Sequence, residues 1–317
     1  TTLHTRTELG ATLRTMTLKE RSQQGILLLD GAMGTMIQNY KLSEDDFCPP
    51  GYKPSKSLKG NNDLMALAQP EKLAKIHAAY FEAGSDMVET NTFSGTTIAQ
   101  ADYACEALVD DINYHSARIA KEVAEKFTKL NPNKPRFVAG AIGPTNRTAS
   151  LSPDVNNPGY RATTFEELKK AYKQQVKGLV KGGVDAILIE TIFDTLNAKA
   201  AIYATLEAYD ELDTELPIMI SGTITDASGR TLSGQTTEAF LISVSHAPLL
   251  SVGLNCALGP EEMVPYLRTL KTKSPFITSA YPNAGLPNEM GEYDLDPEAM
   301  GEYVKQFLDE DLVGILG

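Results

Sequence analysis

The sequence is poor in cysteine, histidine, tryptophan and long apolar runs. Its 317 residues include three cysteines, at 48, 105 and 256, four histidines and no tryptophan. Three cysteines do not make a disulfide framework, which favours a reducing, cytoplasmic compartment. The longest apolar run near the start, 26–29, is far shorter than the roughly 20 residues of a membrane helix. Residues 1–25 also lack the apolar core of a secretory signal.

Basic residues are also in the minority. Lys and Arg number 29 against 41 Asp and Glu, a net charge of −12. This balance argues against nucleic acid as a partner, because such binding depends on Lys and Arg that neutralise phosphates. It also argues against an anionic membrane surface. The 42% of hydrophobic residues is enough for a large core.

Several common catalytic motifs are missing. There is no phosphate-binding P-loop and no Gly-x-Ser-x-Gly nucleophile elbow. The run Gly140–Gly143 leads into proline and does not complete a dinucleotide fingerprint. No lysine follows an expected strand, which argues against Schiff-base chemistry.

Eight short, nearly continuous apolar runs alternate with helical patterns. Such runs are typical of parallel strands buried on both faces. Eight βα units in one chain of this length predict a (β/α)8 TIM-type barrel of the α/β class, with an open doubly wound sheet as the competitor. The expected strands are 26–30, 86–90, 137–143, 186–191, 218–223, 251–256, 276–280 and 312–317.

Helices are expected between the strands. Residues 98–127 are long enough for two helices or one bent one, and Thr164–Glu167 resembles a capping box. Residues 1–22 are expected to form a helical lead-in, and residues 23–317 the barrel. Insertions at 41–62 and 145–163 follow strand ends, so we expect them over the C-terminal face, where loops of such barrels carry function. The other expected helices are 70–83, 168–180, 195–209, 237–246, 259–270 and 296–308.

Three carboxylates and one thiol stand at the ends of expected strands: Asp30, Glu89, Glu190 and Cys256. In a barrel they converge on one mouth. Each also has a simpler explanation. Asp30 can serve a turn or helix cap, and the two glutamates can be solvated loop residues. A lone cysteine is most often a small buried hydrophobe. Because a catalytic zinc needs three protein ligands and no histidine follows a strand, spacing alone favours that reading for Cys256.

Longer runs at these same positions resemble the homocysteine S-methyltransferase family, and within it the homocysteine-binding module of cobalamin-dependent methionine synthases. The resemblance extends from about residue 22 to the end and implies a (β/α)8 barrel. It rests on the runs 29–36, 89–93, 143–150, 190–199, 221–235, 253–260 and 282–287.

The resemblance implies a Zn²⁺ ion held by three cysteine thiolates. Cys256 matches the first, and the other two are expected beyond Gly317. The chain as given is therefore expected to lack a complete zinc site, to hold no cofactor tightly and to be inactive in isolation. In the complete module, zinc deprotonates the substrate thiol. Methylcobalamin, presented by a separate module, then donates the methyl group. The implied partners are homocysteine and the folate- and cobalamin-binding modules of the same polypeptide.

The resemblance also assigns the substrate's other groups. Two carboxylates are expected to bind the ammonium group of homocysteine. The backbone N–H groups of a Gly-Ala-Met turn are expected to bind its carboxylate, because charge requires that pairing. The expected substrate-binding residues are Asp30, Gly31, Ala32, Met33, Glu190, Asn255 and Asn283, with Glu89 and Asn91 in support.

Other functions stay open at this stage. One alternative is a stand-alone homocysteine S-methyltransferase that uses betaine or S-methylmethionine. A second is a catalytically inert, metal-free barrel. A third is a hydrolase in which Asp30 and Glu190 act as an acid/base pair.

Overall fold

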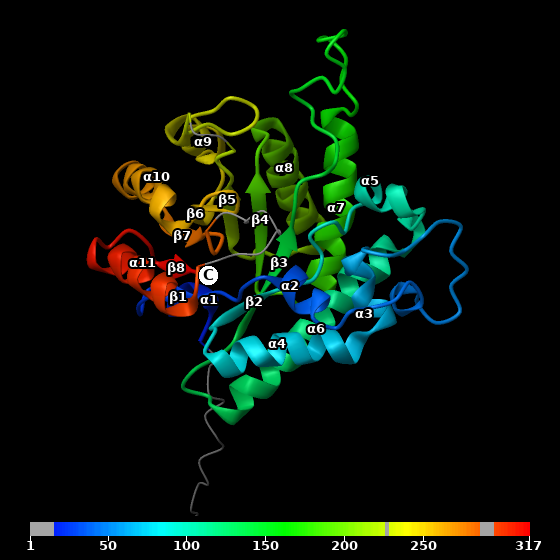
Figure 1. Ribbon diagram of the computed structural model, residues 1–317, viewed down its shortest axis with the longest axis horizontal. Coiled ribbons are helices and arrows are strands. Elements are labelled where there is room, and N and C mark those ends of the chain that lie inside the picture. Colours follow the sequence, from blue (N-terminus) through cyan, green and yellow to red (C-terminus); the bar gives the residue numbers. More distant parts are fainter. Residues whose placement is uncertain (1–15, 226–227, 286–294) are drawn as a thin grey trace, which may run out of the picture.

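The computed structural model describes residues 16–225, 228–285 and 295–317. Eight parallel strands are hydrogen-bonded in the order β1-β8-β7-β6-β5-β4-β3-β2, with helices around them (Figure 1). The fold is a (β/α)8 TIM-type barrel, as the alternating pattern predicted. The strands are β1 Leu27–Leu28, β2 Met87–Glu89, β3 Phe137–Ile142, β4 Ala186–Ile192, β5 Ile218–Gly222, β6 Leu249–Asn255, β7 Ile277–Tyr281 and β8 Ile315–Leu316.

The α-helices agree with the expected pattern and add short ones inside the loops. The capping box at Thr164 is present, with both of its reciprocal hydrogen bonds. The segment 98–127 is broken, because two 3₁₀ turns separate a short helix from a long one. The α-helices are α1 Leu18–Ser22, α2 Met33–Gln38, α3 Met65–Ala68, α4 Pro70–Ala83, α5 Thr97–Gln100, α6 Val109–Leu130, α7 Phe165–Gly182, α8 Thr195–Leu212, α9 Thr237–Val244, α10 Pro260–Lys273 and α11 Pro297–Asp309.

Part of the expected lead-in and two of the family-like runs reach outside the described residues. Of residues 1–22, only the end is described, and it contains α1. Asp226 and Ala227, within the run 221–235, and the last two residues of the run 282–287 also lie outside the described ranges.

The strands are apolar on both faces because alternate residues enter different cores. In β2, Met87 packs inside the barrel and Val88 packs against the helices; in β4, Leu188 and Ile189 divide in the same way. This two-residue period is the geometry of a strand. It explains why the sequence shows continuous apolar runs rather than alternation.

Strands β1 and β2 do not pair in the sheet, and side chains bridge the seam between these two strands. The Asp86 carboxylate accepts hydrogen bonds from the Leu28 N–H (3.0 Å) and from Arg21 (3.1 Å) at one end of this seam. Near the mouth, Asp30 Oδ2 accepts a hydrogen bond from the Glu89 N–H at 3.0 Å. One backbone bond, from the Asp86 N–H to the Leu28 carbonyl at 2.7 Å, lies between them.

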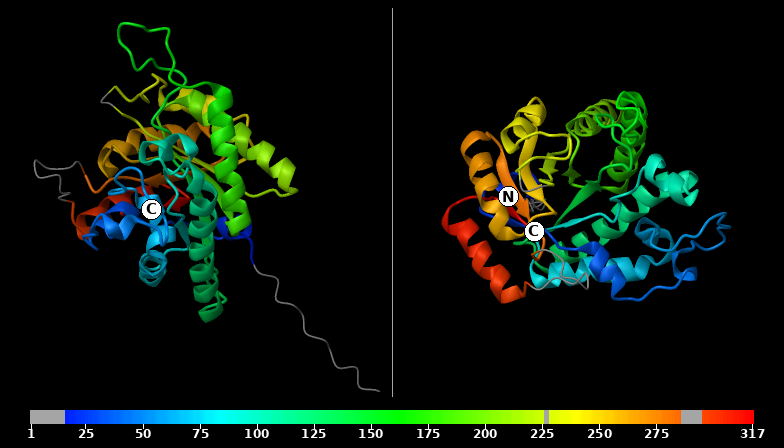
Figure 2. Two further views of the ribbon diagram at one scale, coloured as in Figure 1. Left: turned by 90° about the vertical axis from the view of Figure 1, so that its right-hand side faces the viewer. Right: turned by 45° about the horizontal axis from the view of Figure 1, so that its top comes forward.

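The insertion between β3 and α7 rises beyond α7 at the top of Figure 1 and is seen from the side in Figure 2. Its base is fixed by Asp194, whose carboxylate accepts hydrogen bonds from the Ser150 N–H and Oγ. Asp194 also caps α8. Among the described residues, no helix is long and apolar enough to cross a membrane.

Candidate active site

A cavity of about 450 Å³ opens at the C-terminal ends of the strands. The ends of six strands contribute to its wall, together with the loop before α3 and the loop after β2. This is the face on which TIM barrels place their functional groups. The lining residues are Asp30, Gly31, Ala32, Met33, Gly34, Gly60, Asn61, Asn62, Asp63, Glu89, Thr90, Asn91, Phe93, Ser94, Tyr103, Glu190, Thr191, Asn255, Cys256, Tyr281, Pro282, Asn283 and Gly317.

Strand periodicity explains which side chains reach this cavity from inside the barrel. Met87 and Leu188 face the interior, so Glu89 and Glu190, two residues further along, face it as well. The interior of the barrel is therefore apolar at the level of Met87 and Leu188 and polar at the level of Glu89 and Glu190, next to the mouth. Asn255 and Tyr281 end β6 and β7 and line the same cavity.

Asp30, Glu89 and Glu190 form a carboxyl cluster in which Asp30 and Glu190 are buried and Glu89 is half-buried. Asp30 and Glu190 are each 6% exposed, and the side chains of Glu89 and Glu190 are hydrogen-bonded to each other. Burial raises the pKa of all three carboxyls, and the charge of Glu89 raises the pKa of Asp30 and of Glu190 further. Such a cluster shares protons when no cation lies among its members.

Tyr281 completes this polar layer. Its hydroxyl donates a hydrogen bond to Glu190 Oε2 at 3.5 Å. Burial, followed by the charge of Glu190, raises the pKa of Tyr281 well above its usual value, so the phenol stays protonated. Tyr281 is not among the residues predicted for the site, although the two-residue alternation within 277–281 indicates that its ring faces the interior.

Cys256 lies directly after β6, and its thiol lines the cavity. Its backbone N–H donates to the Tyr281 carbonyl at 3.3 Å, and its Sγ accepts a hydrogen bond from Asn255 Nδ2 at 3.3 Å. Burial and then the nearby Glu190 charge raise the pKa of the thiol. Without a metal or another positive partner, Cys256 is therefore protonated at neutral pH.

The outer part of the cavity combines the predicted Asn91 with residues outside the predicted site. Asp63 is 6% exposed, and its Oδ1 accepts a hydrogen bond from the Ser94 N–H at 3.2 Å. Burial raises the pKa of Asp63 to about 7. Asn91 donates to the Asn62 carbonyl at 2.7 Å, which holds the insertion 41–62 against the loop after β2. Phe93 and Tyr103 add aromatic surface there.

The structure brings all of the predicted site residues to this one cavity. Asp30, Gly31, Ala32, Met33, Glu89, Asn91, Glu190, Asn255, Cys256 and Asn283 line it together. The other two cysteines lie elsewhere, because Cys105 is buried in a separate apolar cluster and Cys48 packs against that cluster.

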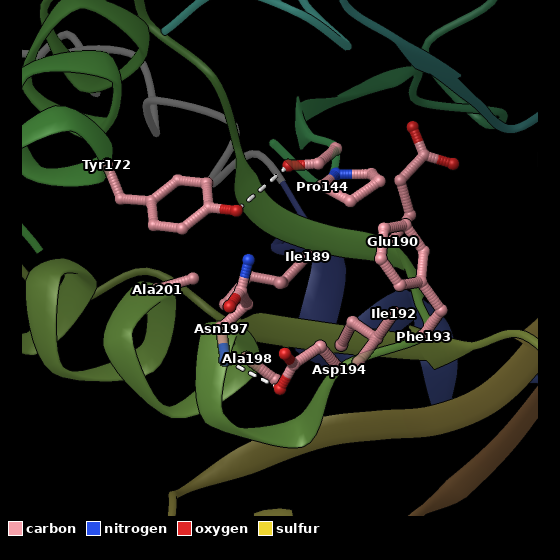
Figure 3. Close-up of a pocket in the computed structure, with 11 residues that line it drawn as sticks. Pro144, Tyr172, Ile189, Glu190, Ile192, Phe193, Asp194, Asn197, Ala198 and Ala201 are labelled. Atoms are coloured by element: carbon pink, nitrogen blue, oxygen red, sulfur yellow. Dashed lines mark hydrogen bonds between the residues drawn. The ribbon is translucent and has the colours of Figure 1, made fainter. Parts of the chain in front are cut away.

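A second, much smaller cavity lies between β4, α7 and α8 (Figure 3). Its volume is about 10 Å³, which is room for about one water molecule. Tyr172 points toward the Gly143 carbonyl on one side and Asp194 lies at the start of α8 on the other. This cavity is too small for a substrate, so the large cavity is the candidate active site.

The described residues do not by themselves supply a zinc site. Within residues 16–225, 228–285 and 295–317, no group of three or more His, Cys, Asp or Glu side chains is arranged to hold a metal ion. Cys256 is the only one of the three cysteines that lines the large cavity. One thiol is fewer than the three protein ligands of a catalytic zinc.

The fold and the site together are those of a (β/α)8-barrel enzyme, with carboxyl groups and one thiol gathered at the C-terminal ends of the strands. A family model described as homocysteine S-methyltransferase matches residues 27–317. The chain belongs to the homocysteine S-methyltransferase family.

Solved structures of the homocysteine methyltransferase MmuM from Escherichia coli share the fold. The oxidized form of MmuM is 20% identical to this chain, with a TM-score of 0.70. The match covers 92% of this chain and 90% of the MmuM chain. The metallated form of MmuM is 21% identical to this chain, also with a TM-score of 0.70. That match covers 94% of this chain and 92% of the MmuM chain.

Proposed function

We propose that this chain is the homocysteine-binding part of a cobalamin-dependent methionine synthase. In that enzyme, the thiolate of homocysteine accepts a methyl group from methylcobalamin, and 5-methyltetrahydrofolate is the ultimate donor. The observation that carries the proposal is the gathering of Asp30, Glu89, Glu190 and Cys256 in one cavity of a barrel of this family.

The buried carboxyl groups suit the ammonium group of an amino acid. Three carboxyls in a low-dielectric cavity repel one another when ionised. A bound ammonium group compensates that charge and donates up to three hydrogen bonds, which strengthens its pairing with Asp30 and Glu190. Glu89, hydrogen-bonded to Glu190 and joined to Asp30 through its own N–H, orients both carboxyls.

The carboxylate of the substrate is bonded to the same carbon as its ammonium group, so it would lie beside that group, next to the backbone that follows Asp30. Gly31, Ala32 and Met33 present backbone there, at the start of α2. Gly31 has no side chain, and a Cβ at this position would lie 3.3 Å from the Tyr80 ring. Asn283 adds an amide to the same cavity and is held by the hydrogen bond from its N–H to the Leu258 carbonyl at 3.0 Å.

Zinc is part of the proposal, although the described residues supply only one of its ligands. In our proposal, Cys256 is one of three thiolates, and the other two follow Gly317 in the complete module. Gly317 lines the same cavity, where a Cβ would lie 3.0 Å from the Asp30 carbonyl and from the Tyr281 Cβ. A zinc ion bound there would supply the charge that deprotonates the substrate thiol.

We further propose a cytoplasmic protein whose residues 23–317 form one substrate-binding domain after the lead-in 1–22. In support, all three cysteines are free thiols, which suits a reducing compartment. The proposed partners are the folate- and cobalamin-binding modules of the same polypeptide, which would meet the barrel at its open mouth.

A second candidate is a stand-alone methyltransferase that uses betaine or S-methylmethionine. The same family match supports it. Phe93 and Tyr103 on the outer wall of the cavity favour it as well, because aromatic faces attract methylated cations.

Homocysteine binding to the chain, measured by calorimetry, tests the proposal. We expect Asp30→Asn and Glu190→Gln each to weaken binding at least tenfold, because each removes a negative partner of the ammonium group. Cys48→Ser, which alters a thiol that does not line the cavity, is the matched control and leaves binding unchanged. Absence of binding by the unaltered chain contradicts both candidates.

The methyl donor separates the two candidates. The chain extended through the two proposed thiolates after Gly317 is supplied with homocysteine, zinc and one donor at a time, and methionine is measured by mass spectrometry. Methionine formed from methylcobalamin alone supports the synthase assignment. Formation from betaine or S-methylmethionine supports the stand-alone enzyme.

A further inference from the structure

The side chain of Asn255 connects the end of β4 with the Cys256 thiol. Its Oδ1 accepts a hydrogen bond from the Thr191 N–H at 3.0 Å, and its Nδ2 donates to Thr191 Oγ1 at 2.8 Å and to Cys256 Sγ at 3.3 Å. A backbone N–H can only donate, so the Thr191 N–H determines that the oxygen of the amide faces it. The NH₂ group therefore faces the sulfur.

The backbone on both sides of this amide is unusual. Thr191 has φ +55° and Cys256 has φ +56°, values that are rare for residues other than glycine and especially for a β-branched residue. Such conformations persist only where surrounding contacts determine them. Two of the three hydrogen bonds of the Asn255 amide end on Thr191, and these bonds hold in place the irregular end of β4, where the strand register shifts between Ile189 and Ile192.

The backbone of Asn255 is fixed as well. Thr223, just after β5, donates from its N–H to the Ile192 carbonyl at 2.8 Å and from its Oγ1 to the Asn255 carbonyl at 3.0 Å. Asn255 is 1% exposed and Thr223 is 5% exposed. Three neighbouring strand ends, those of β4, β5 and β6, are thereby joined in one buried polar network.

We infer that Asn255 is a positioning residue, which holds the Glu190 carboxyl and the Cys256 thiol in a fixed relation. Both N–H groups of its amide are bonded within the protein, so neither is left for a ligand. The inference rests on the proposed function, in which Glu190 receives the ammonium end of homocysteine and Cys256 lies at its sulfur end. It replaces direct substrate contact as the role of Asn255.

Hydrogen exchange tests the structural part without any substrate. In the full chain, we expect Asn255→Ala to accelerate exchange of the Thr191 amide at least tenfold, because the acceptor is lost. Asn255→Asp keeps an acceptor oxygen at that place and retains the protection. Mass spectrometry of peptides from 187–193 gives the rates, and Asn157→Asp in the exposed insertion is the control. Equal rates in the unaltered chain and Asn255→Ala overturn the inference.

Homocysteine affinity tests the positioning part. Asn255→Asp removes the donors to Sγ and Thr191 Oγ1 while preserving shape, and we expect at least tenfold weaker binding. Thr191→Val, which removes the hydroxyl acceptor, also weakens binding, whereas Thr191→Ser restores it. The Asn255→Asp, Thr191→Val double variant is expected to bind no more weakly than Asn255→Asp alone, because both changes break one network.

The outcomes separate this inference from the proposed function. If the unaltered chain binds no homocysteine, the proposed function fails, and the exchange rate of the Thr191 amide still decides whether Asn255 holds the irregular end of β4 in place. If Asn255→Asp binds homocysteine as well as the unaltered chain, Asn255 only supports the fold and the inference is overturned. Additive losses in the double variant also overturn it, because they would mean that Asn255 contacts the ligand itself.

Discussion

Two ionisable residues are buried in the described part of the chain with few polar contacts. Asp63 accepts a hydrogen bond from the Ser94 N–H, and burial raises its pKa to about 7. His77 in α4 is 0% exposed, neither of its ring nitrogens has a hydrogen-bond partner in the described residues, and burial lowers its pKa to about 4. Both side chains are neutral in the folded state over most of the acid range.

The two groups are expected to change stability with pH in opposite directions. Between pH 3.8 and about 7 the folded state keeps the Asp63 proton that the unfolded chain releases, so stability falls as pH rises. Between about pH 4 and 6.5 the folded state excludes the His77 proton that the unfolded chain binds, so stability falls as pH falls. Asp63→Asn should therefore stabilise the protein above pH 7 by at most about 4 kcal/mol, and His77→Leu near pH 4 by at most about 3 kcal/mol.

Urea unfolding at a series of pH values measures both effects. His115→Leu and Asp311→Asn, at exposed positions, are the matched controls and should not change the pH slope. A slope that is the same in all variants would show that neither burial energy is as large as the pKa values imply.

At the scale of elements, helix caps that have more hydrogen-bond partners should contribute more to the free energy of unfolding. Thr164 makes only the capping box of α7, so Thr164→Ala is expected to cost about 1 kcal/mol. Asp194 caps α8 and also holds the insertion 145–163 through Ser150. Asp194→Ala is expected to cost about 2–3 kcal/mol, because several buried and partly buried donors lose a charged partner.

Limited proteolysis separates the two caps further. Asp194→Ala should expose the exposed stretch 153–161 to faster cleavage, whereas Thr164→Ala should not. Equal cleavage in the two variants would contradict the role of Asp194 in anchoring the insertion.

At the scale of the whole molecule, the barrel depends on the seam between β1 and β2. Asp86 is 2% exposed and binds both Arg21 and the Leu28 N–H. Asp86→Ala is expected to cost about 3 kcal/mol, because it leaves a partly buried cation and a backbone donor without their acceptor. Asp311→Ala, which removes an exposed partner of Lys271, should cost no more than about 0.5 kcal/mol.

Unfolding in urea gives these energies, and hydrogen exchange of the Leu28 amide reports on the seam itself. Faster exchange at Leu28 in Asp86→Ala, with unchanged exchange within β4, would locate the loss at the seam. Loss of the same stability in both variants would contradict this account.

Much of the architecture follows from the sequence alone. The eight apolar runs predicted all eight strands, because a parallel strand in this fold needs apolar side chains on both faces. The helix start at Thr164 could be predicted because a capping box is formed by residues close together in the chain. The expected helix 70–83 matches α4, with proline at its first position. The strand-end residues Asp30, Glu89, Glu190 and Cys256 could be gathered into one site, since parallel strands bring their C-terminal ends to one face.

Only the tertiary structure decided how these groups meet. The pairing of Glu89 with Glu190, the Tyr281 hydroxyl on Glu190 and the Asn255 amide between Thr191 and Cys256 join residues up to 101 positions apart in the chain. The bridge of the β1–β2 seam by Asp86 and the entry of Asp63 into the cavity are of the same kind. Local pattern determines which segments form strands and helices. Burial, charge and hydrogen bonding at the mouth depend on which segments the barrel brings together.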